Sequence, residues 1–153
     1  QRQMCIRDRR MPLDQNWKFA VIIPDYEVRT ADARRAMPKE IAVKDSVFTT
    51  SHAIAMIEAL RSGSEELLAE ACQDVLHEPC RRKLIKDYDS VRASAKAAGA
   101  PAFFISGSGS TMIAFTKSET VAKRFIELVR ARHPNFAGHV LHAAADGVRV
   151  ETK

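Results

Sequence analysis

The sequence predicts a single α+β domain with a mostly antiparallel sheet and helices packed on one face. Four short apolar runs have the length of strands, and the segments between them carry apolar residues at helical spacing. Glycine or proline lies close to the ends of several of these segments. The chain has 153 residues, of which 46% are hydrophobic, enough for one ordinary core.

The first strand and a short helix follow from residues 19–38. The continuous apolar run Phe19 to Ile23 stops at Pro24, which is typical of a buried strand. Thr30 is expected to cap a brief helix. That helix should end near Met37, because Pro38 disfavours helical geometry in the residue before it.

A longer helix is predicted from a cap at Asp45 to a stop at Gly63. Two rows of apolar positions run along it, with Val47, Ile54 and Ile57 in one and Phe48, His52 and Met56 in the other. A helix that is apolar on two sides usually lies between packed layers. We therefore expect His52 to be at least partly shielded from water.

Two more helices are predicted before the second strand. Ser64 begins the first of them and Pro79 ends it. Its apolar stripe consists of Leu68, Ala71, Cys72 and Val75. The second runs from about Asp89 to Ala98, and Gly99 supplies a left-handed C-terminal cap.

The segment Ser106 to Thr111 connects two predicted strands, at 103–105 and 112–115. Its two glycines permit backbone conformations that a side chain would forbid, and its hydroxyls and N–H groups could converge on an anion. A phosphate-binding turn and a tight polar hairpin are equally compatible with this segment alone.

The C-terminal part completes the predicted topology. Ser118 caps an amphipathic helix that ends before Pro134, and a last strand is expected from His139 to Ala145. The order of elements contains the β-α-β-β-α-β arrangement of a ferredoxin-like sheet. Small-molecule kinases, amino-acid sensors and RNA-binding domains all use this fold, so the fold alone does not choose a function.

Charge and cysteine content exclude several classes of function. The net charge is +5, but residues 1–10 hold four arginines and one aspartate, which leaves 20 basic and 18 acidic residues elsewhere. This balance does not favour a nucleic-acid partner. Three cysteines without C-x-x-C spacing indicate neither a zinc site nor a disulfide framework, and they fit the cytoplasm. No apolar run predicts a membrane span or a secretion signal.

Residues 1–10 show neither helical nor strand periodicity. We interpret them as a non-native or disordered leader, similar to a translated sequencing adapter, and assign the domain to residues 11–153.

Three motifs together resemble a known enzyme family. They are Thr30-Ala31-Asp32-Ala33-Arg34 with Met37-Pro38, Glu78-Pro79-Cys80-Arg81, and Ser106-Gly107-Ser108-Gly109. Their order and spacing resemble homoserine kinase, one of the small-molecule kinases named for galactose, homoserine, mevalonate and phosphomevalonate. The resemblance covers roughly residues 17–150 and corresponds to the C-terminal half of such an enzyme.

The resemblance implies transfer of the γ-phosphoryl group of ATP to the hydroxyl of L-homoserine, a step in threonine biosynthesis. The family's ATP loop, P-x-x-x-G-L-G-S-S, does not occur in the sequence. ATP and Mg²⁺ would accordingly be bound mainly by an N-terminal domain absent from this chain, and we expect the chain alone to show no kinase turnover. L-Homoserine and ATP are the implied partners, and a homodimer is a candidate assembly.

The resemblance also implies roles for single residues. Arg34 and Arg81 would hold the substrate carboxylate, for which a planar guanidinium group is well suited. The alternatives are a solvated helix arginine for Arg34 and an exposed basic run for Arg81. Thr30 would lie beside the same substrate, unless its hydroxyl only caps a helix. His52 would lie at the substrate pocket or between the two halves, with a hydrogen-bonded core histidine as the alternative.

The loop residues Ser106, Gly107, Ser108 and Gly109 would support the phosphate site. Cys80 replaces a usual tyrosine and Ser110 a usual proline, which puts local geometry in doubt. No residue of this chain is assigned as catalytic, and none as a metal ligand.

Two other functions remain compatible with the sequence. One is a different kinase of the same superfamily, whose substrate lacks a carboxylate. The other is a non-catalytic ferredoxin-like module that senses an amino acid, which would leave the glycine loop without a role.

Overall fold

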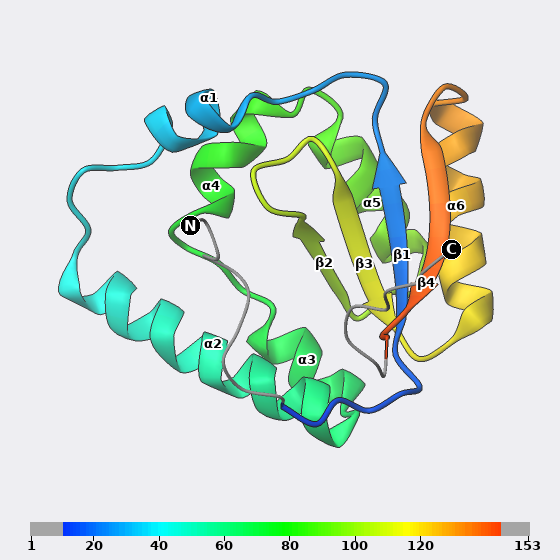
Figure 1. Ribbon diagram of the computed structural model, residues 1–153, viewed down its shortest axis with the longest axis horizontal. Coiled ribbons are helices and arrows are strands. Elements are labelled where there is room, and N and C mark those ends of the chain that lie inside the picture. The colour runs from blue at the N-terminus through cyan, green and yellow to red at the C-terminus, as the bar shows by residue number, and fades with distance from the viewer. Residues whose placement is uncertain (1–10, 145–153) are drawn as a thin grey trace, which may run out of the picture.

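Within residues 11–144, which the computed structural model describes, four strands form one antiparallel sheet (Figure 1). They are β1 Lys18–Ile23, β2 Ala102–Ile105, β3 Met112–Thr116 and β4 Ala137–His142. Their order in the sheet is β2-β3-β1-β4. This arrangement confirms the predicted ferredoxin-like α+β fold. The leader assigned to residues 1–10 and the strand end expected at Ala145 lie outside the described residues.

The register of the sheet places β1 at its centre. Ala20 lies opposite Ala114 of β3 on one side and Val140 of β4 on the other. Side chains alternate between the two faces along each strand, so Phe19 and Ala20 belong to different cores.

Six helices and one short 3-10 turn accompany the sheet in the part of the chain that is described. They are α1 Thr30–Arg35, α2 Val43–Ser62, α3 Glu65–Ala71, α4 Glu78–Arg81, the 3-10 turn η1 Arg82–Leu84, α5 Tyr88–Ala98 and α6 Glu119–Arg132. Helices α5 and α6 cover the face of the sheet behind the strands in Figure 1.

The main core lies between the sheet and these two helices. Ile22 and Met112 from the strands pack with Val91 of α5 and Phe125 of α6, and all four side chains are fully buried. A second core lies on the opposite face, where α2 and α3 approach the sheet, so the helices pack on both faces and not on one as predicted. It is built around Trp17, Ala59, Leu68 and Ala102.

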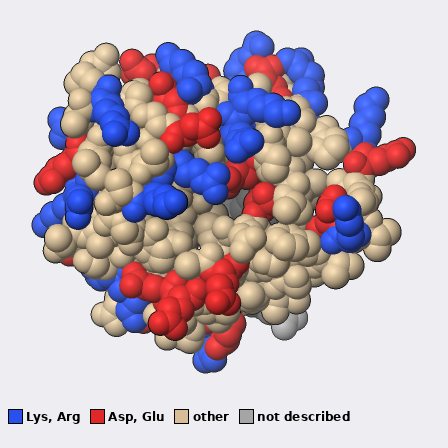
Figure 2. All heavy atoms as spheres, turned by 180° about the vertical axis from the view of Figure 1, so that it is seen from behind, with Lys and Arg blue, Asp and Glu red and all other residues tan. Residues whose placement is uncertain are grey.

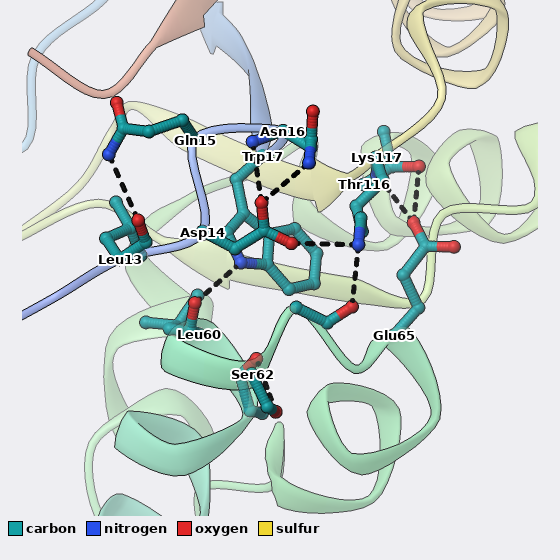
Figure 3. A network of polar contacts seen from close by, with 12 residues as sticks. Leu13, Asp14, Gln15, Asn16, Trp17, Leu60, Ser62, Glu65, Thr116 and Lys117 are labelled. Carbon is teal, nitrogen blue, oxygen red and sulfur yellow. Dashed lines mark hydrogen bonds and ion pairs between the residues drawn. The ribbon is translucent and has the colours of Figure 1, made fainter.

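A polar network holds the second core together (Figure 3). The Trp17 indole donates to the Leu60 carbonyl oxygen at 2.9 Å. Lys117 Nζ lies 2.8 Å from a carboxylate oxygen of Asp14 and donates to the Gly63 carbonyl at 3.1 Å. Because these residues come from three distant segments, the network fixes the α2–α3 turn against the ends of β1 and β3.

Several helix boundaries differ from the predictions. Arg29, not Thr30, is the N-cap of α1, and its side chain makes no capping bond. Helix α2 begins at Val43 after Ala42, so Asp45 lies in the first turn and favours the helix dipole without capping it. Ser64 and Ser118 do cap α3 and α6, accepting from the backbone N–H groups three residues ahead.

The prediction that Pro79 ends the third helix was wrong, because α3 stops at Ala71 and Pro79 lies in the first turn of α4. A proline is tolerated there, since first-turn N–H groups have no partner within the helix. Asp74 explains the break, because its carboxylate accepts from the backbone N–H groups of residues 76, 77 and 78. Val75 is 42% exposed and leaves the predicted stripe.

The prediction that α2 lies between packed layers was also wrong. Only one of its two apolar rows faces the protein, and Ala59 is the one fully buried residue of this helix. Val47, Ile54 and Ile57 are exposed.

Candidate substrate site

Three segments that are far apart in the sequence meet at one end of the sheet. They are the start of α1, helix α4 and the loop 106–111 that joins β2 to β3 (Figure 1). The Thr30 hydroxyl lies 3.4 Å from that of Ser108, and Arg81 donates from Nη1 to the Gly107 carbonyl at 2.8 Å. The structure therefore brings Thr30, Arg81 and the glycine loop together.

The loop is a hairpin connection closed by its own backbone. Ser106 N–H donates to the Thr111 carbonyl at 2.9 Å, and Gly109 N–H donates to the Ser106 carbonyl at 3.1 Å. Gly107 and Gly109 have φ angles of 59° and 89°, in the left-handed region that favours glycine. Among the described residues, the N–H groups of Gly107 and Ser108 have no such internal partner and remain free to meet an anion.

The Arg81 guanidinium is fixed to the glycine loop and has one buried donor without a partner among the described residues. Its Nη1 is tied to the loop, while its Nε is buried and has no hydrogen-bond partner among residues 11–144. A buried guanidinium N–H without a partner is energetically costly unless a ligand accepts from it. The most common such ligands are carboxylates and phosphates, which match the guanidinium fork.

A cavity of 290 Å³ opens beside Arg81. Arg81 and Gly107 form one wall, and Asp74, Glu78 and Phe104 lie among the other lining residues. Both oxygens of the Asp74 carboxylate already accept hydrogen bonds, together from three backbone N–H groups. Asp74 therefore fixes the backbone that lines the cavity.

A hydrogen bond between Glu78 of α4 and Tyr88 of α5 was not predicted from the sequence, and we call it the Glu78–Tyr88 anchor. The Tyr88 hydroxyl donates to Glu78 Oε1 at 2.5 Å, and the tyrosine is 2% exposed. Burial, followed by this contact with Glu78, raises the pKa of Tyr88 well above its usual range, so it stays a donor. Ten residues separate the two side chains, and their spacing gives no signal of contact.

His52 lies in a neighbouring cavity of 150 Å³ that shares Asp74, Glu78 and Phe104 with the first. Its Nδ1 donates to the Phe48 carbonyl at 2.9 Å, and its ring stacks on that of Phe48 at 3.8 Å. The side chain is partly buried, as expected. His52 thus borders the Arg81 site across a shared wall and does not enter it.

Cys72 lines the same second cavity but is not a nucleophile there. Burial raises the pKa of its thiol to about 12, and its Sγ lies 3.5 Å from the Phe103 carbonyl oxygen. The thiol therefore stays protonated and acts as a weak donor.

Arg34 lies on α1, is exposed, and does not line the Arg81 cavity. The neighbouring Asp32 pairs with Arg29 and Arg35, so it leaves Arg34 unengaged. The two arginines expected to share a carboxylate are consequently placed on adjoining segments, and within residues 11–144 only the Arg81 side chain has a hydrogen-bond partner.

No group of three or more His, Cys, Asp or Glu residues between positions 11 and 144 is placed to hold a metal ion. No helix among the described residues is long and apolar enough to cross a membrane.

The face opposite to that of Figure 1 carries charges of both signs (Figure 2). Acidic side chains gather at its lower edge, and basic ones are scattered over its upper part. The charge on this face is divided between the two signs.

A family profile described as "GHMP kinases C terminal" matches residues 56–135. The chain belongs to the GHMP kinase family. The matched region contains Arg81, the glycine loop and the sheet strands on either side of it. Thr30, Arg34 and His52 lie outside it.

Curated relatives extend the match over most of the chain. A homoserine kinase of Aquifex aeolicus is 33% identical over 147 residues, which are 93% of this chain and 49% of that protein. A homoserine kinase of Microchaete diplosiphon is 41% identical over 109 residues, or 71% of this chain and 36% of that protein. The chain thus spans half or less of the length of these relatives.

A solved structure supports the same assignment. The homoserine kinase of Cytophaga hutchinsonii superposes with a TM-score of 0.81 at 29% identity, over 89% of this chain and 44% of that one.

Proposed function

We propose that this chain forms the substrate-carboxylate side of a homoserine kinase. The enzyme would transfer the γ-phosphoryl group of ATP to the hydroxyl of L-homoserine and give O-phospho-L-homoserine. The relatives named above support this reaction, and the buried, unpartnered Nε of Arg81 beside a cavity is the observation that carries it.

The substrate carboxylate would accept from Arg81 Nε and from the second terminal nitrogen of the same guanidinium. Arg81 is already oriented by Gly107, so little side-chain freedom is lost on binding. Arg34, on the adjoining helix α1, would supply a second positive charge, and the Thr30 hydroxyl would lie between the substrate and Ser108. His52 would not touch the substrate directly. It would act through Glu78 and Phe104, which line both cavities.

The loop 106–109 would support the phosphate groups. The free N–H groups of Gly107 and Ser108 and the Ser108 hydroxyl are donors suited to an anion. Main binding of ATP and of Mg²⁺ is assigned to a part of the enzyme outside this chain, because the chain spans half or less of its relatives' length and does not contain the loop P-x-x-x-G-L-G-S-S. Mg²⁺ would neutralise charge on the transferred phosphoryl group.

The free thiols of Cys72 and Cys80 suit a reducing compartment, and we propose the cytoplasm as the location. By itself the 153-residue chain would show no ATP-dependent phosphorylation of homoserine. Measurable turnover by the purified chain would contradict the assignment of ATP and Mg²⁺ binding to another part of the enzyme.

The test compares Arg81→Ala, Arg81→Lys and Arg82→Ala in the full-length polypeptide, with initial rates measured for L-homoserine and for ATP. Arg82 is the control because it is an exposed arginine next in sequence. A charged hydrogen bond is worth about 1.5–3 kcal/mol, so Arg81→Ala should lower kcat/KM for homoserine by roughly 10- to 150-fold. Arg81→Lys should recover only part of this, since lysine cannot bind bidentately.

In the same assays Arg82→Ala should stay within about twofold of the native enzyme, and KM for ATP should change little in all three variants. A loss confined to KM for ATP would reassign Arg81 to the nucleotide. A polypeptide that binds L-homoserine but phosphorylates no alcohol would support the amino-acid sensor instead.

A further inference from the structure

Helix α4 carries two opposite charges that do not pair with each other. Glu78 and Arg81 lie three residues apart on this helix, and both line the cavity of 290 Å³. Side chains at this spacing are neighbours on a helix, and opposite charges there attract each other. Within residues 11–144, however, the Glu78 carboxylate makes no ion pair with Arg81, and the Arg81 Nε has no acceptor.

The spacing of three residues permits an ion pair in this protein without forcing one. Glu58 and Arg61 of α2 pair at 2.7 Å. Asp89 and Arg92 of α5 have the same spacing and form no pair within the described residues; Arg92 lies near Glu78 instead. A further contact must therefore decide which way the Glu78 carboxylate points.

The Glu78–Tyr88 anchor supplies this contact. The Tyr88 hydroxyl donates to Glu78 Oε1 at 2.5 Å, and Arg92 Nη1 lies 3.9 Å from the same oxygen. Both of these partners belong to α5, whereas Arg81 is fixed to the glycine loop through the Gly107 carbonyl. The Glu78 carboxylate is thus held toward α5 while the Arg81 guanidinium is held toward the loop.

Tyr88 is itself fixed in the main core. Its side chain is fully enclosed, and its ring centroid lies 5.6 Å from that of Phe103. Burial, and then the contact with Glu78, raises the pKa of the Tyr88 hydroxyl, so this group keeps its proton and remains a donor. Because α4 is a single turn, which is marginally stable alone, its side chains depend on such outside contacts for their orientation.

From these contacts we propose that Tyr88 is a positioning residue that prevents Glu78 from neutralising Arg81. Without the Tyr88 hydroxyl, the Glu78 carboxylate would turn to the Arg81 Nε–H and occupy the donor that a substrate carboxylate needs. Tyr88 does not line the cavity and acts only through Glu78. The inference rests on the proposed function, because it explains how the Arg81 donor stays available to the substrate.

The kinetic test compares Tyr88→Phe with Tyr88→Phe/Glu78→Gln in the full-length polypeptide. Tyr88→Phe should raise KM for L-homoserine about tenfold and change kcat less than about twofold, because Glu78 then competes with the substrate for Arg81. The double variant removes the competing charge and should return KM to within about threefold of the native value. If Tyr88 only stabilised the fold, the second substitution would not rescue the first.

Thr116→Val is the matched control. The Thr116 hydroxyl donates to Glu65 Oε1 at 2.9 Å and is buried, so this substitution also removes a buried bond between a hydroxyl and a carboxylate. Neither residue lines the Arg81 cavity. KM for L-homoserine should stay within about twofold of the native value, although stability falls. Urea unfolding of every variant checks that it is folded and measures its loss of stability.

A second measurement needs no substrate. In proton–nitrogen NMR of the 153-residue chain, Tyr88→Phe should move the Arg81 Nε–H resonance downfield before any ligand is added, since Glu78 now accepts from it. The double variant should bring the resonance back toward its native position.

An unmoved resonance in Tyr88→Phe would overturn the inference. So would a double variant whose KM stays as high as that of Tyr88→Phe. If the full-length polypeptide phosphorylated no homoserine, the proposed function would fail, and the NMR comparison would still decide the role of Tyr88.

Discussion

At the scale of single residues, the two glycines of the 106–111 loop are not equivalent. Both have positive φ, but a Cβ on Gly107 would meet open space, whereas one on Gly109 would lie 2.8 Å from Ile85 Cδ1. Ile85 is 2% exposed and has little room to move. Substitution of Gly107 should therefore cost stability only through the backbone conformation, whereas substitution of Gly109 should add the cost of crowding against Ile85.

Gly107→Ala should lower the free energy of unfolding by about 1 kcal/mol, the cost of a left-handed alanine. Gly109→Ala should lower it by about 2–3 kcal/mol, because the overpacking of Ile85 adds to the same backbone cost. Urea unfolding of the two variants measures the difference. Equal losses would mean that Ile85 does not restrain the loop.

The Asp14–Lys117 pair predicts a pH dependence of stability. Lys117, first through its hydrogen bond, lowers the pKa of Asp14 in the folded protein. The unfolded pKa is about 3.9, so the pair's full contribution is present above that pH and is lost as the pH falls through the folded value.

Asp14→Asn should therefore flatten the decline in stability below about pH 4, while the native chain loses stability there. Urea unfolding at pH 5 and at pH 3 measures both chains, and Lys117→Met serves as the matched control from the other partner. An identical pH dependence in all three would show that the ion pair does not contribute.

At the scale of secondary structure, side-chain capping distinguishes helices that looked alike in the sequence. Ser118 caps α6, with Oγ accepting from Val121 N–H at 3.3 Å, while Thr30 is the first residue of α1 and faces Ser108. The Thr30 hydroxyl is thus not occupied by a helix cap, which leaves it available to a ligand.

Ser118→Ala should cost about 1 kcal/mol of stability, as is usual for the loss of a cap. Thr30→Ala should cost less than about 0.5 kcal/mol, because it removes only a long contact at the surface. Thermal unfolding of both variants gives the comparison. A larger loss of stability for Thr30→Ala than for Ser118→Ala would indicate that Thr30 does cap α1, as predicted from the sequence.

The strands were predicted to within a few residues because glycine, proline or a polar turn limits their short apolar runs. The end of α3 was missed because Asp74 diverts three backbone N–H groups, a local competition that apolar spacing does not reveal. The exposed side of α2 was missed for another reason. A helical pattern identifies apolar faces, but not what lies opposite each of them.

At the scale of the whole molecule, the site is assembled by topology. Helices α1 and α4 and the 106–111 loop converge because β1 and β2 end, and β3 begins, at the same end of the sheet (Figure 1). The resemblance to homoserine kinase pointed to Arg81 and the loop, whereas the residues alone left an exposed basic run as the alternative for Arg81. The Glu78–Tyr88 anchor depends on tertiary packing and could not be predicted from spacing.

The central claim is that the cavity beside Arg81 receives the carboxylate of an amino acid. The Nε–H of Arg81 can be followed directly by proton–nitrogen NMR of the 153-residue chain, with Arg81→Lys used to assign its signal. Titration with L-homoserine should shift this resonance downfield, and titration with L-homoserine methyl ester should leave it in place. Equal shifts with the two compounds, or no shift with L-homoserine at millimolar concentration, would contradict the claim.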